Sequence, residues 1–357
     1  MKTKSTRRIA AFTSILFVAL AHASFAQDFS TASAINNNGV IIGGSLLDDQ
    51  TGFDAFILTK RGVADLGTFG GFASIALGIN ERGDTVGQSD TAQSDLFGNA
   101  ISFAFLADSH GVRSLGSLAG LNNSQAFAIN NRGTIVGRAY NNAEDPSRAF
   151  DFRAFVFKHG AMRDIGTLGG ATAEAFGIND RGSIVGDAQT AMGERHAFLF
   201  RRPDENDNGD EHGDENAVMR DLGTFGGNFS QARSINDRGQ IVGRSRLASG
   251  QQHAFLYERG RMKDLGTLGG TFSRAEFINE HGQIVGFSST VDGDFHAFLY
   301  MAGHMQDLGT LGGSYSAAFG INNHGEIIGE SDTVTGDTHA FVARDGVMVD
   351  IDKHLPH

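Results

Sequence analysis

The chain of 357 residues contains no cysteine and no tryptophan, and it has only 3 prolines. Without cysteine, the protein has no disulfide, no thiolate ligand for a metal ion and no cysteine that a lipid could modify. A mature chain of roughly 330 residues buries enough apolar surface to fold without such staples. The scarcity of proline favours regular strands joined by few irregular connectors.

The sequence is also poor in basic residues, with 29 Lys and Arg against 41 Asp and Glu and a formal net charge of −12. Four of the basic residues lie within residues 1–26, which have the pattern of a secretory signal. Removing these four positive charges changes the net charge from −12 to −16. Such a balance disfavours nucleic acid and anionic membranes as partners.

The signal has three parts. A basic segment ending at Arg8 precedes an apolar run over residues 9–21, and small residues around Ala26 form a cleavage site, with Ala23 as a competing site. The run is too short to span a bilayer, which needs about 20 residues. We therefore expect an exported protein, secreted or periplasmic, with no stable membrane insertion after removal of the signal.

Glycine, at 49 residues, is abundant because one unit of about 43 residues recurs seven times. A repeat of this length indicates an array or a ring of small structural units. The asparagine of its "IN" pair stands at Asn36, Asn80, Asn130, Asn179, Asn236, Asn279 and Asn322. The phenylalanine of its "AF" pair stands at Phe56, Phe105, Phe155, Phe198, Phe255, Phe298 and Phe341.

Most intervals within the unit are constant. The asparagine precedes the last glycine of "IVG" by 7 residues in every unit. From that glycine to the residue before "AF" the interval is 10 in units four to seven, 11 in unit one and 16 in units two and three. Unit four carries a separate excess of 14 residues after "HAF". Constant intervals are typical of strands and tight turns, whereas variable intervals are typical of exposed loops.

Each unit predicts four strands and a tight turn. In "INDRGQIVG" the asparagine begins a type I turn that ends on a left-handed glycine. The flanking runs, such as 254–257, are apolar on consecutive residues, which indicates strands buried on both faces. "GG" doublets are expected where backbones lie close together.

These features predict an all-β, seven-bladed β-propeller, with an open β-solenoid or a sandwich as alternatives. Seven whole units without polar capping repeats favour a closed ring, because an open solenoid needs caps. The predicted domains are the signal at 1–26, the repeat domain at 27–352 and a tail at 353–357. The units cover about 28–70, 71–119, 120–169, 170–226, 227–269, 270–312 and 313–352.

The insertion in unit four has the spacing of a calcium-binding loop, D-x-N-x-N-G-x5-E, in which Gly209 permits the sharp turn. Two features depart from that motif: Glu211 replaces the usual apolar residue, and strands flank the loop in place of helices. The alternative is a solvated acidic loop. The candidate calcium ligands are Asp204, Asn206, Asn208, Asp210 and Glu215.

Histidine precedes "AF" in units four to seven, at His196, His253, His296 and His339. Equivalent positions in adjacent units lie around a ring, too far apart to share one metal ion. We therefore expect each histidine to hydrogen-bond a neighbouring strand.

The "GTLGG" segments recur and lack a lysine, so they do not indicate a phosphate-binding loop.

The long connectors of units two and three, 88–102 and 138–152, are the clearest departure from the repeat. In an antiparallel meander alternate connectors emerge at the same edge, so we expect both on one face with the "GTLGG" turns. Their carboxylates and aromatic rings suit a glycan or a cation, or glycosidic hydrolysis by two carboxylates. The alternative is a pair of tolerated surface insertions. The candidate ligand-binding residues are Asp95, Tyr140, Glu144, Asp145, Phe150 and Phe152.

Taken together, "HAFLY", "DLGTLGG" and "INxxGxIVG" make the chain resemble the HAF-repeat family of extracellular bacterial proteins. The resemblance covers everything after the signal and implies export and a repeat-built β domain. It implies no chemistry. Units one to three depart from the pattern, since they have Asp54, Phe103 and Arg153 in place of the histidine.

We therefore expect an exported, monomeric, non-catalytic scaffold that binds a ligand on one face. The expected partner is an extracellular protein or a glycan, and calcium is the one cofactor that the sequence suggests. The alternative is a secreted hydrolase or lyase that acts on polysaccharides, with its carboxylates in the long connectors.

Overall fold

The computed structural model describes residues 29–46, 52–95, 98–142, 152–201 and 218–355. It contains 28 strands and one short 3-10 helix, Asp352–His354 (η1). The described residues include no helix that is long and apolar enough to cross a membrane. The expectation of an all-β chain is confirmed.

Each sequence unit contributes four consecutive strands. The strands of units one to three are β1 (Ser30–Ile35), β2 (Ile41–Leu46), β3 (Phe53–Thr59), β4 (Gly62–Asp65), β5 (Gly70–Ile79), β6 (Thr85–Ser94), β7 (Ala100–Asp108), β8 (Gly111–Gly116), β9 (Asn123–Ile129), β10 (Ile135–Tyr140), β11 (Phe152–Lys158) and β12 (Ala161–Asp164). Those of units four and five are β13 (Gly169–Ile178), β14 (Ile184–Thr190), β15 (Arg195–Arg201), β16 (Val218–Asp221), β17 (Gly226–Ile235), β18 (Ile241–Leu247), β19 (Gln252–Glu258) and β20 (Arg261–Asp264). Those of units six and seven are β21 (Gly269–Ile278), β22 (Ile284–Thr290), β23 (Phe295–Met301), β24 (His304–Asp307), β25 (Gly312–Ile321), β26 (Ile327–Thr333), β27 (Thr338–Arg344) and β28 (Val347–Asp350).

Within a unit the strands pair in sequence order as an antiparallel meander. In unit five, β18 pairs with β17 and β19, and the short β20 pairs with β19. The predicted turn joins β17 to β18, and its glycine, Gly239, has a φ of 77°. The equivalent glycines of the other units have φ values between 73° and 87°. The "IN" turn is therefore confirmed as a type of turn that needs a left-handed glycine.

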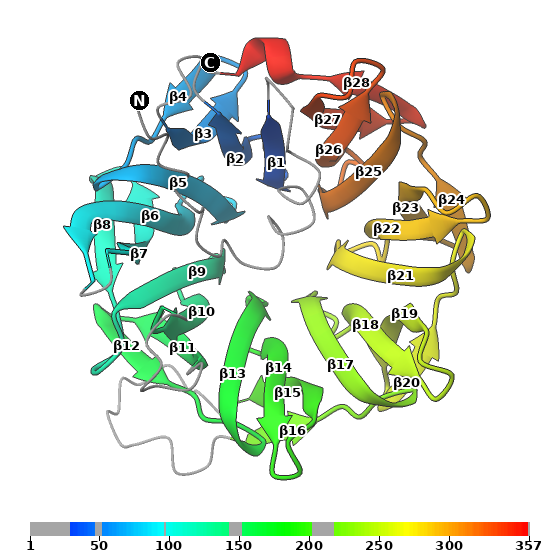
Figure 1. Cartoon of the computed structure of the whole chain (residues 1–357), viewed down its shortest axis with the longest axis horizontal. Coiled ribbons are helices and arrows are strands. Elements are labelled where there is room, and N and C mark those ends of the chain that lie inside the picture. Colours follow the sequence, from blue (N-terminus) through cyan, green and yellow to red (C-terminus); the bar gives the residue numbers. More distant parts are fainter. Residues whose placement is uncertain (1–28, 47–51, 96–97, 143–151, 202–217, 356–357) are drawn as a thin grey trace, which may run out of the picture.

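The units follow one another around a central axis (Figure 1). The first strand of each unit, such as β5, β13 or β21, lies innermost, and the short fourth strand lies at the rim (Figure 1). After one circuit the chain returns to its starting point, so that β1 packs beside β25, β26 and β27.

The contact between the last and first units repeats the contact between consecutive units. Phe29 forms a parallel bridge with Thr338, as Phe295 does with Tyr315 one unit earlier. The first and last units are each built from consecutive strands. The circle is therefore completed by packing and local bonds, without exchange of a strand between the ends.

A serine on the first strand forms a clasp with the preceding unit. The Ala297 backbone N–H donates to Ser316 Oγ at 2.8 Å, and Ser316 Oγ donates to the Gly309 carbonyl at 2.6 Å. At the closure, the Ala340 N–H donates to Ser30 Oγ at 2.9 Å in the same way. The serine therefore accepts the same backbone N–H inside the chain and at its ends, whereas at the closure Ser30 Oγ donates to the Asp352 carboxylate in place of a glycine carbonyl.

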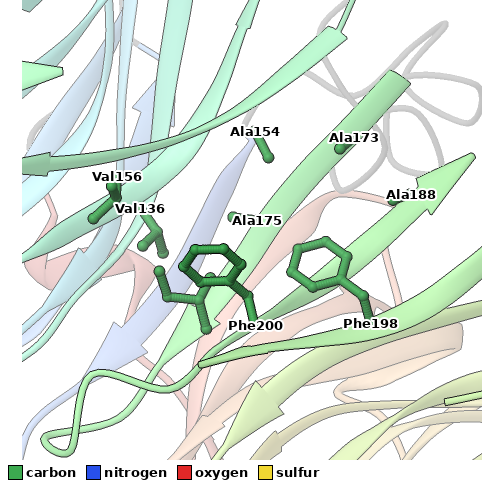
Figure 2. Close-up of a cluster of buried hydrophobic side chains, with 9 residues drawn as sticks. Val136, Ala154, Val156, Ala173, Ala175, Ala188, Phe198 and Phe200 are labelled. Carbon is green, nitrogen blue, oxygen red and sulfur yellow. The ribbon is translucent and has the colours of Figure 1, made fainter. Parts of the chain in front are cut away.

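Apolar side chains fill the space between neighbouring units. Figure 2 shows this core between units three and four, where Val136 and Val156 pack in one cluster with Ala175, Phe198 and Phe200. The "AF" phenylalanine, here Phe198, is fully buried in every unit. Each sheet is covered on both faces by its neighbours, as the consecutive apolar residues predict.

The connector of unit two differs from the sequence prediction. β6 extends to Ser94 and β7 begins at Ala100, and these two residues pair. Beyond them, the Asp95 backbone N–H donates to the Asn99 carbonyl at 2.9 Å. The expected loop over 88–102 is therefore largely a β-hairpin, because its residues continue the ladder of the two strands.

Candidate functional site

The repeated asparagines hold the ring together. Asn236 Oδ1 accepts the backbone N–H of Gln240 at 3.1 Å, and its Nδ2 donates to the Asn279 carbonyl of the next unit at 3.1 Å. Asn322 donates in the same way to the Asn36 carbonyl at 3.3 Å. The bonds run in a closed circle through Asn36, Asn80, Asn130, Asn179, Asn236, Asn279 and Asn322.

The residues that follow these asparagines surround a central cavity of about 220 Å³. Their side chains accept backbone N–H groups of the preceding unit, as Asp237 Oδ1 does from Asp180 N at 2.9 Å. The part of the chain that the structure describes holds no group of three or more His, Asp or Glu suited to a metal ion. The carboxylates of Glu81, Asp180, Asp237 and Glu280 at this end of the ring accept backbone N–H groups and so join neighbouring units.

The last glycine of "IVG" is needed because two strands approach closely. A Cβ on Gly243 would lie 1.9 Å from the Gln231 carbonyl oxygen, and a Cβ on Gly137 would lie 1.9 Å from that of Gln125. The second glycine of "GG" is confined similarly, since a Cβ on Gly227 would lie 2.7 Å from the Arg246 carbonyl oxygen. The prediction that glycines stand where backbones crowd is confirmed.

The repeated histidines pair with the aspartate of "DLG" on the adjacent outer strand. His253 Nδ1 lies 2.8 Å from Asp264 Oδ2, and His196, His296 and His339 make the equivalent contact at 2.7–2.8 Å. The expectation of a hydrogen bond to a neighbouring strand is confirmed. Where the histidine is replaced, the pair changes as well: Arg153 lies 3.5 Å from Asp164 in unit three.

In unit one an aspartate replaces the histidine, and its pKa is raised. Asp54 occupies its position and faces Asp65, the "DLG" aspartate. Burial and the negative charge of Asp65 both raise the pKa of Asp54. The histidine and its aspartate are therefore a structural pair of the repeat.

Since the repeated residues serve the scaffold, ligand-specific residues are expected where the units differ. The residue after "IVG" is Gly44, Gln88, Arg138, Asp187, Arg244, Phe287 or Glu330 in units one to seven. In units three to six these positions and their neighbours on the innermost strand carry buried charges. Packing of identical units does not require these charges, and burying a charge has a large desolvation free energy.

Between units three and four these charges are balanced. Arg138 Nη1 donates to Glu174 Oε1 at 2.5 Å, and Arg195 donates to Glu174 Oε2 at 2.8 Å and to Asp187 Oδ2 at 2.5 Å. Burial alone would raise the pKa of Glu174, but Arg138 and Arg195 outweigh it and hold that pKa below its ordinary value. Gln231 of unit five completes the group by donating to Asp187 Oδ1 at 2.9 Å.

Unit seven buries the carboxyl group of Glu330, which forms no ion pair with a cation in the described parts of the chain. Glu330 accepts a hydrogen bond from the Tyr315 hydroxyl at 3.0 Å and is 1% exposed. Burial, with a further contribution from Asp332, raises the pKa of Glu330 to about 7. This group titrates near neutral pH.

Two of the predicted ligand-binding aromatics lie together, but they pack on a protein cation. The Arg138 guanidinium lies 4.8 Å from the Tyr140 ring centre and 5.0 Å from that of Phe152. The Tyr140 hydroxyl accepts a hydrogen bond from Gln88 Nε2 of unit two at 2.7 Å. Tyr140 therefore joins units two and three, and the stacking surface of both rings is partly used within the protein.

The long connectors of units two and three do contact each other. Asn142 Nδ2 donates to Asp95 Oδ2 at 2.9 Å, and nearby Ser102 Oγ donates to the buried Asp90 at 2.6 Å. The "GTLGG" turns lie at the same end, as shown by the bridge between Leu168 and Thr190. The expectation that connectors and turns share one end is confirmed, and we call it the connector end.

The remaining predicted site residues lie outside the described residues. They are the candidate ligand-binding residues Glu144, Asp145 and Phe150 and the candidate calcium ligands Asp204, Asn206, Asn208, Asp210 and Glu215.

No protein-family model matches the sequence, and no curated protein matches it. Solved structures match it in fold. The β-propeller domain of the Trilobed protease from Pyrococcus furiosus covers 91% of this chain and 97% of its own, with 8% identity and a TM-score of 0.59. The described chain has the β-propeller fold. A puromycin-hydrolysing peptidase of Mycobacterium tuberculosis and a puromycin hydrolase also align with this β-propeller, at 10% identity and a TM-score of 0.59.

This β-propeller covers 54% and 57% of the length of those two enzymes, and identities of 8–10% show the fold alone. The likeness to the HAF-repeat family therefore rests on its motifs. Sequence reasoning missed the buried charges of units three to six. The signal available was the presence of Arg, Glu and Asp in the first and second strands of these units, where apolar residues are expected.

Proposed function

We propose that the chain is an exported, monomeric, seven-bladed β-propeller of HAF-repeat type, and that it binds an extracellular protein non-catalytically at its connector end. Support for seven blades comes from the asparagine circle, which returns to Asn36 from Asn322. Support for export comes from the leader-like residues 1–26.

The observation that carries the binding proposal is the exposure of apolar side chains at the connector end. Met192, Val291 and Val334 are 89%, 78% and 81% exposed. Val291 and Val334 directly follow the threonine that ends the second strand of their unit, and Met192 stands two residues after that threonine. Phe72, beside the "GG" doublet of unit two, is 55% exposed. Single exposed apolar residues are ordinary, but several at one end of a ring favour a protein partner.

The test is a binding screen with a matched pair of variants. The mature protein is immobilised and offered envelope and secreted proteins in one arm and a glycan panel in the other. A triple variant, Met192→Ser, Val291→Ser and Val334→Ser, is expected to lose the protein partner while melting as the parent does. The control, Val218→Ser with Val347→Ser, alters apolar residues that are each 63% exposed on the outer strands and is expected to bind normally.

Equal binding by both variants would contradict the use of the connector end. A glycan ligand in place of a protein would redirect the proposal to the residues around Asp95 and Tyr140. Turnover of a polysaccharide by the parent would replace it with the enzymatic alternative.

A further inference from the structure

The buried charges between units five and six are not balanced. Arg233 of β17 and Arg274 of β21 both pair with one carboxylate, Glu276 of β21. Arg233 Nε donates to Glu276 Oε2 at 2.9 Å, and Arg274 Nη2 lies 3.3 Å from the same oxygen. All three side chains are at most 7% exposed. One negative charge therefore serves two buried guanidinium groups.

A third guanidinium, that of Arg244 on β18, adds to this surplus. Among the described residues its side chain makes one hydrogen bond, a long one from Nη1 to Gln252 Oε1 at 3.4 Å. Burial lowers the pKa of Arg244 most, and the positive charges of Arg233 and Arg246 lower it further. The negative charges of Glu276 and Asp187 act in the opposite direction. We call Arg233, Arg244 and Arg274 the arginine cluster.

The surplus of positive charge remains when the neighbouring units are included. Across units three to six, the five arginines Arg138, Arg195, Arg233, Arg244 and Arg274 face the three carboxylates Glu174, Asp187 and Glu276. The half-buried Arg246 adds a further positive charge and donates to Asn228 Oδ1 at 3.1 Å. Arg274 has its pKa lowered to about 9, first by burial and then by Arg233 and Arg244.

Two buried donors of the arginine cluster are available for hydrogen bonds. Among the described residues, the buried Arg233 Nη1 and Arg244 Nε have no hydrogen-bond partner. Buried polar atoms are nearly always paired with protein groups, ordered water or an ion, so these two donors are available to a bound group. The groups are also held in place, because Arg233 stacks 4.4 Å from the Phe176 ring centre and Arg244 lies 5.0 Å from that of Phe229.

We propose that the arginine cluster binds an oxyanion of the phosphate, sulfate or carboxylate class. Guanidinium groups present donors in a planar fork that matches such oxygens, and the bound charge offsets the surplus. Arg244 and Arg246 are half-buried and extend the positive charge toward the connector end, where Arg246 pairs with Gln252. The anion enters from that side, either free or as part of a larger ligand.

The test measures anion-dependent stabilisation of the mature protein and of single variants. Melting temperature is recorded with phosphate, sulfate or acetate against chloride at equal ionic strength, and phosphate binding is measured by calorimetry. The parent is expected to gain stability with anion concentration. Arg244→Gln removes one guanidinium group and leaves the ion pairs of Glu276 with Arg233 and Arg274 in place. The affinity for phosphate should therefore fall at least about tenfold.

Two further variants separate binding from a general salt effect, since sulfate stabilises many proteins. Arg113→Gln alters an exposed arginine on β8, which pairs with Asp108 at 2.8 Å, and should respond as the parent does. Glu276→Gln increases the surplus, so it should melt lower in chloride and bind phosphate more tightly. Equal anion responses in the parent, Arg244→Gln and Arg113→Gln would overturn the proposal, as would the absence of calorimetric binding. The proposed protein partner plays no part in this experiment.

Discussion

The serine of the inter-unit clasp shows how a single side chain supports the ring. Ser273 Oγ accepts the Ala254 N–H at 2.7 Å and donates to the Gly266 carbonyl at 2.5 Å. It thereby ties the third strand of one unit to the first strand of the next. In unit four the same position is Ala173, which is fully buried and has no hydroxyl group.

Restoring this serine should stabilise the protein. Ala173→Ser places a hydroxyl between the Ala154 N–H and the Gly166 carbonyl, which are the counterparts of the groups bonded in the other units. We expect a gain of about 1 kcal/mol in the free energy of unfolding, measured by urea denaturation. Ser273→Ala should lose a similar amount. If Ala173→Ser destabilises the protein, the clasp does not act at unit four.

Glu330 should give the stability a pH dependence. Its folded pKa of about 7 exceeds its ordinary value of 4.5, so the folded state favours the protonated form. The stability that this group contributes is full below pH 4.5 and is lost as the pH rises toward about 7. Above that range the buried charge costs roughly 3 kcal/mol.

Glu330→Gln keeps the shape of the neutral acid and removes the titration. We expect the variant to be more stable than the parent near pH 8 and about equal to it near pH 4.5, as measured by urea denaturation. The matched control is Glu326→Gln, an equivalent change at a partly exposed turn residue. A parent whose stability relative to Glu330→Gln stays constant with pH would show that Glu330 is not buried as described.

At the scale of the element, the strands and turns were predictable because each signal recurs in every unit. Strand positions follow from constant spacing, and the "IN" turn follows from an asparagine and a left-handed glycine. The unit-two connector was mispredicted because the residues after Gln88 are polar, whereas the ladder that extends to Ser94 depends on backbone pairing. The arginine cluster was not predictable, since its members come from different strands and meet only when the ring forms.

Shortening the hairpin of unit two should leave the fold intact. Replacing residues 91–101 by the short turn of unit five removes a projection whose pairing with the core ends near Asp90 and Ser102. We expect a loss below about 1 kcal/mol, because repeat proteins distribute stability among neighbouring units. The measurement is thermal melting followed by circular dichroism. Loss of cooperative melting would mean that the contact of Asp95 with Asn142 is needed for folding.

The acidic insertion of unit four makes a separate prediction. If Asp204 and Glu215 bind calcium, millimolar calcium should raise the melting temperature by mass action. Replacing both residues with alanine should abolish that rise without changing the melting temperature in chelator. Magnesium at equal concentration is the control. An unchanged melting curve across the calcium series would remove this site.

At the scale of the whole molecule, the central feature is the closure of the ring between the last and first units. The asparagine circle and the serine clasp both join the last unit to the first, as they join consecutive units. The first and last units are each built from consecutive strands. Because no strand is exchanged, the ring is closed only if contacts such as that between β1 and β27 form.

The absence of cysteine from the sequence makes that contact directly measurable. Phe29→Cys with Thr338→Cys places two thiols on residues that form a bridge across the closure. Paired residues on neighbouring strands lie within the Cα separation that a disulfide requires. A control pair, Phe29→Cys with Phe295→Cys, places the second thiol on another unit. In a closed ring, oxidation of the first pair is expected to give a monomeric, internally cross-linked protein with a higher melting temperature. Intermolecular disulfides alone, or equal cross-linking of both pairs, would contradict the closed ring.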